Sequence, residues 1–398
     1  MDVSVQTARA PAAQLLRDRR RRWIVGLGAA LVLIALLVAA WWLLDARFYE
    51  STDDAYVAGD LVNVMSQVNG TVVSIGADET DLVTAGQELV RLDATDARIA
   101  LQDAEQQLAR TVRQTRTVFA TRDQLQAVVD QRRADLARAQ ADFNRRRNLA
   151  ASGAVSGEEL AHAQDTLNAT RDALVAAQKN LSASSALVGR TGVADNPDVR
   201  AAATQVERAW LALVRTSVRA PVKGYVARRS AQLGERIAPG APLMSLVPLG
   251  RLWLEANFRE MQLRHMRIGQ PVTVVADLYG GRVTYHGRVA GLGLGTGSAF
   301  ALLPAQNATG NWIKVVQRVP VRIELDPREL TTHPLRIGLS TIVRVDLHDT
   351  SGAELAQTPR REPVLETSAY NIDTGEIRAR IEQIINDNIA ESAQRRAP

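Results

Sequence analysis

The chain of 398 residues has no cysteine and few aromatic side chains, only 4% in all. Without cysteine it has no disulfides, no thiolate nucleophile and no cysteine-ligated zinc site. The absence also fits an oxidising compartment, where a stray thiol is a liability. Because aromatic residues are scarce while hydrophobic residues make up 46%, the cores must be aliphatic. The length allows two or three domains.

Sequence motifs of catalysis are missing as well. The chain has no Gly-x-Ser-x-Gly, no Gly-Lys-Ser/Thr after the glycines at 291–297, and no His/Asp/Glu group with metal-ligand spacing. The five histidines stand apart from one another: His162, His265, His286, His333 and His348. We therefore expect no enzyme, no bound metal and no cofactor.

Positive charge is concentrated at the N-terminus. Residues 1–22 carry six arginines against two aspartates, which accounts for +4 of the net charge of +5. The rest of the chain is close to neutral, and this distribution argues against nucleic acid as a partner.

One hydrophobic run is long enough to cross a membrane. Ile24–Leu44 comprises 21 residues without a charge, which as a helix span about 31 Å and match a hydrocarbon core of roughly 30 Å. Arginines precede the run and Asp45 follows it. The positive-inside rule therefore predicts residues 1–22 in the cytoplasm, a transmembrane helix at 23–44 and the remainder outside. A cleaved signal peptide is disfavoured, because its apolar segment has only about 7–15 residues.

Two segments of the chain are similar to each other. Residues 66–92 and 220–246 share their apolar positions, and each contains two glycines spaced by 16. These glycines, which we assign to turns, are Gly70, Gly86, Gly224 and Gly240. Alternating apolar residues with turn glycines are typical of short strands in hairpins. The repeat predicts two halves of one small β-module, at 66–93 and 216–247.

The β-module resembles the lipoyl/biotinyl-carrier fold, in which two similar halves pair into a flattened barrel. A carrier needs a lysine in the turn that joins the halves, after residues 92–94, because the lysine amine bears the cofactor. No lysine lies there, and the chain has only Lys179, Lys223 and Lys314. The module is therefore interpreted as structural.

The segment between the two halves, residues 94–215, is predicted to be an antiparallel helical hairpin. Apolar residues recur every seven positions along both legs, as in a coiled coil. On the second leg they are Leu160, Leu167, Leu174, Leu181 and Val188. Near the tip at 150–157, Gly153 can end the first helix, and Ser156 with Glu159 offers a capping box for the second. About 59 residues of helix in the first leg give roughly 88 Å of rod.

After residue 247 the sequence changes to β character. Five such stretches with glycine-containing loops predict a small antiparallel barrel at 248–348, while 45–65 forms a linker or its first strand. The tail at 349–398 is polar, and either an amphipathic helix or partial disorder is consistent with it. The helix would place on one side Ile377, Ile381, Ile384 and Ile385. The expected fold class is α+β and elongated.

The order of these segments resembles the membrane fusion, or periplasmic adaptor, family, also called the HlyD/EmrA family. Its members combine one anchor, a lipoyl module split by a coiled-coil hairpin, and a β-barrel. The most specific similarity lies at 295–325, with 257–260 and 266–272 before it. A transmembrane signalling rod fits less well, because here a β-module intervenes between the membrane helix and the coiled coil.

The resemblance implies a non-enzymatic adaptor in the inner membrane of a Gram-negative bacterium, single-pass, with most of the chain in the periplasm. Such an adaptor would link a major-facilitator drug/proton antiporter to a TolC-like outer-membrane channel in a multidrug efflux pump. It would act as a homo-oligomer, a trimer or a hexamer. The alternative within the family is the adaptor of an ABC-driven type I secretion system for proteins or toxins.

The family pattern also offers a hairpin-tip motif for docking to the outer-membrane channel: an arginine, a leucine four residues on and a serine seven further. Arg145, Leu149 and Ser156 have this spacing and flank the predicted turn. The alternative interpretation makes Arg145 one of three solvated arginines and Ser156 only a helix N-cap.

A second candidate site is the long loop between two predicted barrel strands, which is rich in Gly, Ala and Ser. We name it as a candidate contact with the transporter, although residue spacing does not require this. Its candidate residues are Ala299, Phe300, Leu302, Leu303, Gln306 and Asn307.

Overall fold

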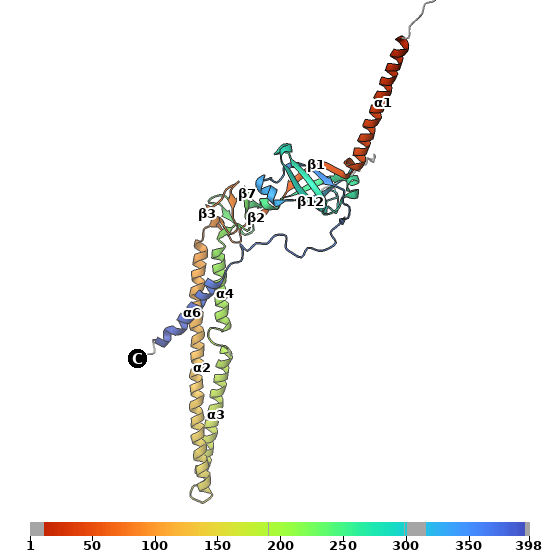
Figure 1. The fold of residues 1–398 in the computed structure, drawn as a ribbon. Coiled ribbons are helices and arrows are strands. Elements are labelled where there is room, and N and C mark those ends of the chain that lie inside the picture. The colour runs from red at the N-terminus through yellow and green to blue at the C-terminus, as the bar shows by residue number, and fades with distance from the viewer. Residues whose placement is uncertain (1–11, 190, 298, 301–315, 395–398) are drawn as a thin grey trace, which may run out of the picture. The chain divides into compact units, whose positions relative to one another are not determined.

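The structure is a computed structural model that describes residues 12–189, 191–297, 299–300 and 316–394. The chain divides into two compact units, each made of two separate stretches of sequence (Figure 1). They are Met1–Val62 with Leu246–Glu366, and Asn63–Ser245 with Thr367–Pro398. The first unit holds an apolar helix and a β-barrel, and the second holds a split β-module with a helical hairpin. The predicted α+β class is confirmed.

The first unit begins with helix α1 (Ala12–Leu44). Its segment Trp23–Leu44 has 22 residues, a mean hydropathy of 2.7 and no part buried within the protein. A helix of that length rises about 33 Å, enough to cross a bilayer. Among the residues that the structure describes, no other helix is long and apolar enough to do so.

Six strands of the first unit close into an antiparallel barrel. In barrel order they are β1 (Tyr49–Ala58), β10 (Trp253–Arg259), β13 (Arg318–Leu325), β12 (Thr284–Leu292), β11 (Pro271–Ala276) and β14 (Ser340–Asp346). Short helices flank them: η1 (Ala46–Phe48), η2 (Leu249–Arg251), η3 (Glu260–His265), η4 (Gly280–Arg282) and α5 (Pro327–Thr332). Because every strand pairs with two neighbours, the barrel leaves no free edge.

Alternating side chains fill the barrel. In β10, Leu254, Ala256 and Phe258 are buried while the residues between them face outward. Tyr285 is fully buried, and its hydroxyl donates to the carbonyl of His333 at 2.9 Å. Burial raises the pKa of Tyr285 to about 12, so this phenol stays neutral and its role is to satisfy a core hydrogen bond.

The β-module of the second unit consists of two four-stranded sheets. One contains, in order, β2 (Val62–Met65), β9 (Pro242–Val247), β7 (Gly224–Arg229) and β4 (Leu82–Val83). The other contains β6 (Ser217–Arg219), β5 (Glu88–Leu92), β3 (Gly70–Ile75) and β8 (Arg236–Ile237). Strand β2 lies within 45–65, which we expected to be a linker or the first barrel strand, so the first half of the module begins before residue 66. With β2 included, each sheet takes two strands from either half, so neither half forms a sheet alone.

The two halves form equivalent hydrogen bonds to each other. The Thr80 N–H donates to the Val226 carbonyl at 2.8 Å, and the Gly234 N–H donates to the Val72 carbonyl at 2.9 Å. Donors and acceptors in the two bonds are both related by 154 positions, the offset between residues 66–92 and 220–246. The sequence repeat is thus an approximate two-fold repeat of the structure.

Two of the four repeat glycines lie in turns. Gly86 and Gly240 have φ angles of 83° and 85°, a conformation that favours glycine. Their N–H groups donate to the carbonyls of Ala220 and Ser66, each at 2.8 Å. The hydrogen bonds from these two turns connect the halves of the β-module at equivalent positions.

The other two repeat glycines do not lie in turns, although the spacing led us to place them there. Gly70 and Gly224 are the first residues of β3 and β7. A Cβ on Gly70 would lie 3.0 Å from the Cβ of Leu92. This glycine therefore permits a close approach of neighbouring strands, which is a second use of glycine in sheets.

In the second unit, helix α2 (Thr95–Ala150) is one leg of the predicted hairpin and runs for 56 residues, about 84 Å. The returning leg is divided into α3 (Gly157–Val188) and α4 (Pro197–Val214). Of the five heptad positions predicted on the second leg, Leu167 and Val188 are buried.

The break in the returning leg has stop and start signals in the sequence. Gly189 ends α3 with a φ of 66°. The side chain of Asn196 then accepts a hydrogen bond from the Asp198 N–H at 3.0 Å, and Pro197 is the first residue of α4. Proline suits this position because the first N–H of a helix has no partner within it.

The tail forms a helix, which settles the choice left open by the sequence. In α6 (Gly375–Gln394), Ile377, Ile384 and Ile385 are buried against apolar residues of α2 and α4. The Arg380 guanidinium pairs with the Glu105 carboxylate at 3.2 Å. The amphipathic side of the helix is therefore covered by the base of the hairpin, which gains a third helix there.

Thr80 provides a test of the approximate two-fold repeat. It has a φ of 73° where its equivalent, Gly234, has 82°. A left-handed conformation costs a residue with a Cβ about 1–2 kcal/mol, whereas glycine loses more backbone entropy on folding, about 0.5–1 kcal/mol. We expect Thr80→Gly to stabilise the β-module by up to about 1 kcal/mol, measured by hydrogen exchange of its strand amides.

The matched variant is Gly234→Thr, which should lower the stability of the same strands. Equal destabilisation by both substitutions would mean that the Thr80 side chain contributes more through contacts than it costs through its backbone conformation.

Candidate functional site

The tip of the hairpin is closed by local hydrogen bonds. Residues 151–156 join α2 to α3 (Figure 1). Three donors converge on the carbonyl of Leu149: the Ser152 N–H at 3.1 Å, the Ser152 hydroxyl at 2.7 Å and the Ala154 N–H at 3.1 Å. Gly153 supplies the left-handed residue of the turn, with a φ of 78°. The Leu149 side chain is left 44% exposed.

Ser156 is the N-cap of α3. Its hydroxyl oxygen accepts from the Glu159 N–H at 3.2 Å, while the Glu159 carboxylate accepts from the Ser156 N–H at 3.0 Å and from the hydroxyl at 3.1 Å. These bonds, the backbone one foremost, hold the pKa of Glu159 below its usual value of 4.5. The predicted capping box is therefore present, and a partner that binds the hydroxyl must compete with it.

The Arg145 side chain forms only a weak, exposed ion pair. Its guanidinium lies 3.3 Å from the Asp142 carboxylate, which also pairs with Arg146 at 2.9 Å, and its side chain is 68% exposed. Exposed pairs of this kind contribute at most about 1 kcal/mol. Arg145 can therefore exchange Asp142 for another acceptor at little cost.

The three residues of the tip motif are close along the chain but do not form one bonded cluster. Arg145 and Leu149 are four residues apart on α2, so they share one face of that helix, and Ser156 begins the next helix. Within the described residues no hydrogen bond or ion pair joins their side chains. The chemistry of Arg145 and Leu149 suits docking: an apolar contact beside a guanidinium donor.

The candidate transporter loop is described only at its start. The Ala299 N–H donates to the Thr296 carbonyl at 2.9 Å, and the Phe300 side chain is 74% exposed. A Cβ on Gly295 would lie 2.6 Å from the Phe300 ring, so the ring folds back over this glycine. The other candidates lie outside the described residues: Leu302, Leu303, Gln306 and Asn307.

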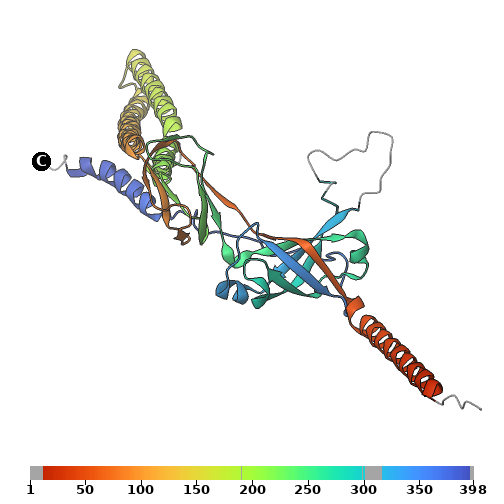
Figure 2. The ribbon, with the colours of Figure 1, turned by 90° about the horizontal axis from the view of Figure 1, so that it is seen from above.

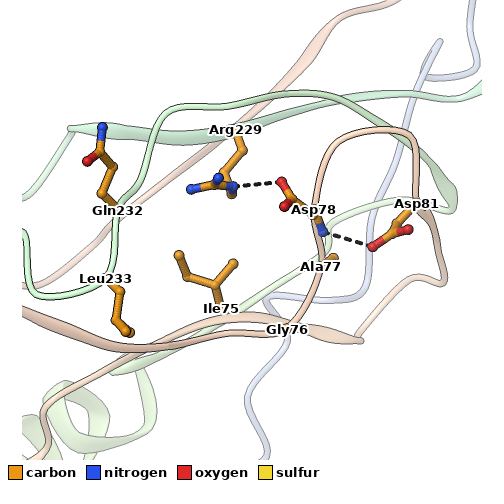
Figure 3. A pocket seen from close by; sticks show the side chains of 8 residues that line it. All are labelled: Ile75, Gly76, Ala77, Asp78, Asp81, Arg229, Gln232 and Leu233. Atoms are coloured by element: carbon orange, nitrogen blue, oxygen red, sulfur yellow. Dashed lines mark hydrogen bonds and ion pairs between the residues drawn. The ribbon is translucent and has the colours of Figure 1, made fainter.

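Sequence reasoning missed a cavity of about 740 Å³ between equivalent loops of the two halves of the β-module. Figure 3 shows Arg229 reaching across it to Asp78, with a distance of 2.7 Å between guanidinium and carboxylate. The hydrogen bond from Arg229 is the main reason that the pKa of Asp78 lies below its usual value. Asp78 also donates its N–H to the Asp81 carboxylate at 2.9 Å.

The residues around this cavity connect the two halves of the β-module through the ion pair between Arg229 and Asp78. Its one guanidinium is already paired with the Asp78 carboxylate, so it is not free for an anionic ligand, and Leu233 at its rim is 70% exposed. The signal in the sequence was the repeat itself, since loops at equivalent positions of a two-fold repeat face each other.

Metal-binding groups are not found in the described part of the chain, where no cluster of three or more His, Asp or Glu could hold an ion. Two histidines have single carboxylate partners on the barrel. His286 lies 2.8 Å from Glu329, and His348 lies 2.6 Å from Asp346. The His348 ring also stacks on Phe48, with centroids 4.5 Å apart, so the contacts of His348 serve packing.

Comparison with known proteins identifies relatives over nearly the whole chain. The family described as "EMRA, alpha-helical hairpin domain" matches residues 95–216. "Multidrug export protein EmrA" of Escherichia coli (strain K12) is 48% identical over 354 residues, which are 89% of this chain and 91% of the relative. "Fatty acid resistance protein FarA" of Neisseria gonorrhoeae is 49% identical over 342 residues, 86% of each chain.

One solved structure is that of "the periplasmic adaptor protein EmrA". It matches 75% of this chain and 99% of its own, with 18% identity and a TM-score of 0.38. The two sequence relatives extend far beyond the hairpin domain, over most of this chain.

Ser156 can be tested as a cap independently of any partner. In Ser156→Ala the first turn of α3 loses its side-chain acceptor, which costs about 1 kcal/mol, so its amides should exchange about fivefold faster. Ser156→Asp keeps an acceptor at the N-cap and should keep the protection. Hydrogen exchange of residues 157–160 measures both, and equal protection in all three proteins would show that the cap contributes nothing.

The same measurement has a defined pH dependence. The pKa of Glu159 is lowered in the folded protein, so its contribution is fully present above the ordinary value of a glutamate. It is lost as the pH falls through the lowered folded value. Protection of the first turn should therefore be constant near neutral pH and should fall below about pH 4.

Proposed function

The chain belongs to the EmrA family of membrane fusion proteins, the periplasmic adaptors, and we propose that it is the adaptor subunit of a multidrug efflux pump. The observation that carries the proposal is the hairpin. Its first leg is an unbroken 56-residue helix, its tip exposes a leucine, and its two legs start and end at one β-module. A rod of about 84 Å without a catalytic site is suited to reaching a distant partner. Its work is structural and not enzymatic.

The apolar helix is the anchor. With arginines before Trp23–Leu44 and Asp45 after it, the positive-inside rule places residues 1–22 in the cytoplasm. The barrel, the β-module and the hairpin then lie in the periplasm of a Gram-negative bacterium. The direction of the chain through the inner membrane is thus set by charge alone.

The energy for export comes from a partner. The 21 residues of Ile24–Leu44 include no ionisable side chain, so the anchor has no group for a proton relay. The partner is a major-facilitator drug/proton antiporter, and the loop that starts at Ala299 and Phe300 is the proposed contact with it. The names of the relatives, a multidrug export protein and a fatty acid resistance protein, favour amphipathic compounds as cargo.

The hairpin tip docks on a TolC-like outer-membrane channel. A channel that ends in helical hairpins offers grooves, and an exposed leucine on a helix fits such a groove as an anchor. Arg145 adds a donor that its weak pair with Asp142 leaves available. A single hairpin encloses no passage, so we propose that several copies, three or six, assemble around the conduit.

The proposal is tested by cross-linking in living cells. A photoreactive residue at position 149 should form an adduct with an outer-membrane channel, identified by mass spectrometry. The same residue at position 187, an exposed site 75% accessible on α3 away from the tip, should not. Adducts from position 149 with inner-membrane or cytoplasmic proteins only would contradict the bridge, and a channel paired with an ABC exporter would indicate type I secretion.

A substitution tests whether docking matters. Leu149→Asp places a charge where an apolar contact is required, so drug resistance should fall to the level of cells that lack the protein, while membrane insertion and transporter association stay intact. Leu187→Asp is the control on the same hairpin and should keep resistance. Full resistance of Leu149→Asp would exclude this leucine from docking, and loss of the protein itself would assign it to folding.

A further inference from the structure

A second cavity lies at the root of the hairpin, within the second unit. It has a volume of about 480 Å³, in the range of cavities that hold small organic ligands. Its walls come from three distant stretches of the chain: residues 65–67, residues 214–219 and residues 369–373. The cavity exists only where the β-module, the end of α4 and the tail meet.

The floor of the cavity is apolar. Val218 is buried and Val214 is half-buried, while Met65 remains 47% exposed. The tail adds the half-buried Ile372 and the ring of Tyr370, which is 46% exposed. A hydrocarbon or aromatic body of a ligand could therefore be covered on two sides.

The rim carries positive charge that the protein does not neutralise. Arg215 makes no side-chain hydrogen bond or ion pair with any described residue. Arg219 lies beside Glu88, but that carboxylate already pairs with Arg91 at 2.6 Å and accepts from the Ser217 hydroxyl at 2.6 Å.

The one acidic residue in the lining of the cavity is Asp373. The Asp373 carboxylate accepts from the Gly375 N–H at 2.8 Å, at the start of α6. An unpaired guanidinium beside an apolar floor has the chemistry to hold the head group of an anion.

We propose that this cavity binds an amphipathic organic anion, with its carboxylate or equivalent acid on Arg215 and Arg219 and its apolar body between Val214, Val218 and Tyr370. The site is distinct from the tip and from the barrel loop. The proposal concerns binding alone, so it holds or fails independently of the adaptor role.

Tyr370 supplies a neutral donor. Its hydroxyl has no hydrogen-bond partner in the described part of the chain, and burial raises its pKa above the usual value of 10.0. The phenol is therefore protonated at neutral pH and can donate to an acid group held by the arginines.

The tail that closes the cavity is fastened on both sides. Before the cavity, the Thr367 hydroxyl donates to the Pro221 carbonyl. After it, α6 is held on the hairpin by its buried isoleucines and by the ion pair of Arg380 with Glu105. Tyr370 and Ile372 are thus presented by an anchored segment and not by a free chain end.

The test uses the full chain in lipid nanodiscs and a dodecanoic acid that carries a diazirine on its chain. After illumination, mass spectrometry should locate labelled peptides at 65–67, 214–219 and 369–373. Unlabelled dodecanoate should compete for this labelling, whereas dodecylamine, which has the same chain and the opposite charge, should not. Labelling confined to the transmembrane helix, or equal competition by the amine, would overturn the proposal.

Variants separate the site from general charge effects. Arg215→Gln with Arg219→Gln should reduce labelling at the cavity by at least about tenfold, since both charged hydrogen bonds to the acid group are lost. Arg171→Gln with Arg228→Gln removes the same charge from exposed positions outside the cavity and should leave labelling unchanged. Equal effects of the two double variants would overturn the site.

Tyr370→Ala keeps both arginines and removes the aromatic wall. It should also reduce labelling at the cavity, while the amide protection of α6 stays as in the parent protein. Undiminished labelling with an intact α6 would exclude the tail from the site.

Discussion

The hydrogen bonds that tie β5 to β6 are the constraint on which the hairpin depends. The Leu92 N–H donates to the Thr216 carbonyl at 2.8 Å, and Val90 pairs with Val218. The chain leaves the β-module at Leu92 and must return beside it, although 123 residues intervene between positions 92 and 216. Because β5 and β6 are neighbours, the two legs start and end side by side, and an antiparallel pair of helices satisfies this closure.

The two-fold repeat extends this constraint to the other end of the module. The strands equivalent to β5 and β6 are β9 and β2, which also pair. Along the chain, β9 leads to barrel strand β10, and β2 follows barrel strand β1. Each of these two strand pairs combines one strand from either half, and each connects to a larger element: the hairpin in one case and the barrel in the other. A small structural module thus acts as the junction of the chain.

The sequence predicted the elements that carry a recognisable pattern, but it did not show which distant residues come together in space. Heptads and the 154-position repeat are periodic signals and the apolar run is a contiguous one, and each corresponds to an element of the structure. The glycine spacing could not distinguish Gly86, which needs a left-handed turn, from Gly70, which needs room beside Leu92. A glycine needed for a turn and a glycine needed for a close approach of strands look the same in the sequence.

The tail and the cavities were hidden for a related reason. Isoleucine spacing showed that one side of the tail helix is apolar but not what covers it, because Ile384 shares a buried cluster with Val112, which lies some 270 residues earlier in the chain. The cavity at the hairpin root joins Met65, Arg215 and Tyr370, which no local pattern connects. The tip differs again: its spacing came with the family resemblance, and the structure confirms the capping box that the sequence predicted at Ser156.

The position of the hairpin-root cavity allows a bound ligand to stabilise the docked state of the tail. Arg215 ends the returning leg, whereas Tyr370 belongs to the tail. A ligand that contacts both binds only while the tail is docked, so its binding energy favours the docked state by mass action. The docked tail in turn places α6 on α2 and α4, below the break at Gly189. The base of the hairpin would then be stiffest when the ligand is bound, while the two-helix portion beyond the break keeps its own packing.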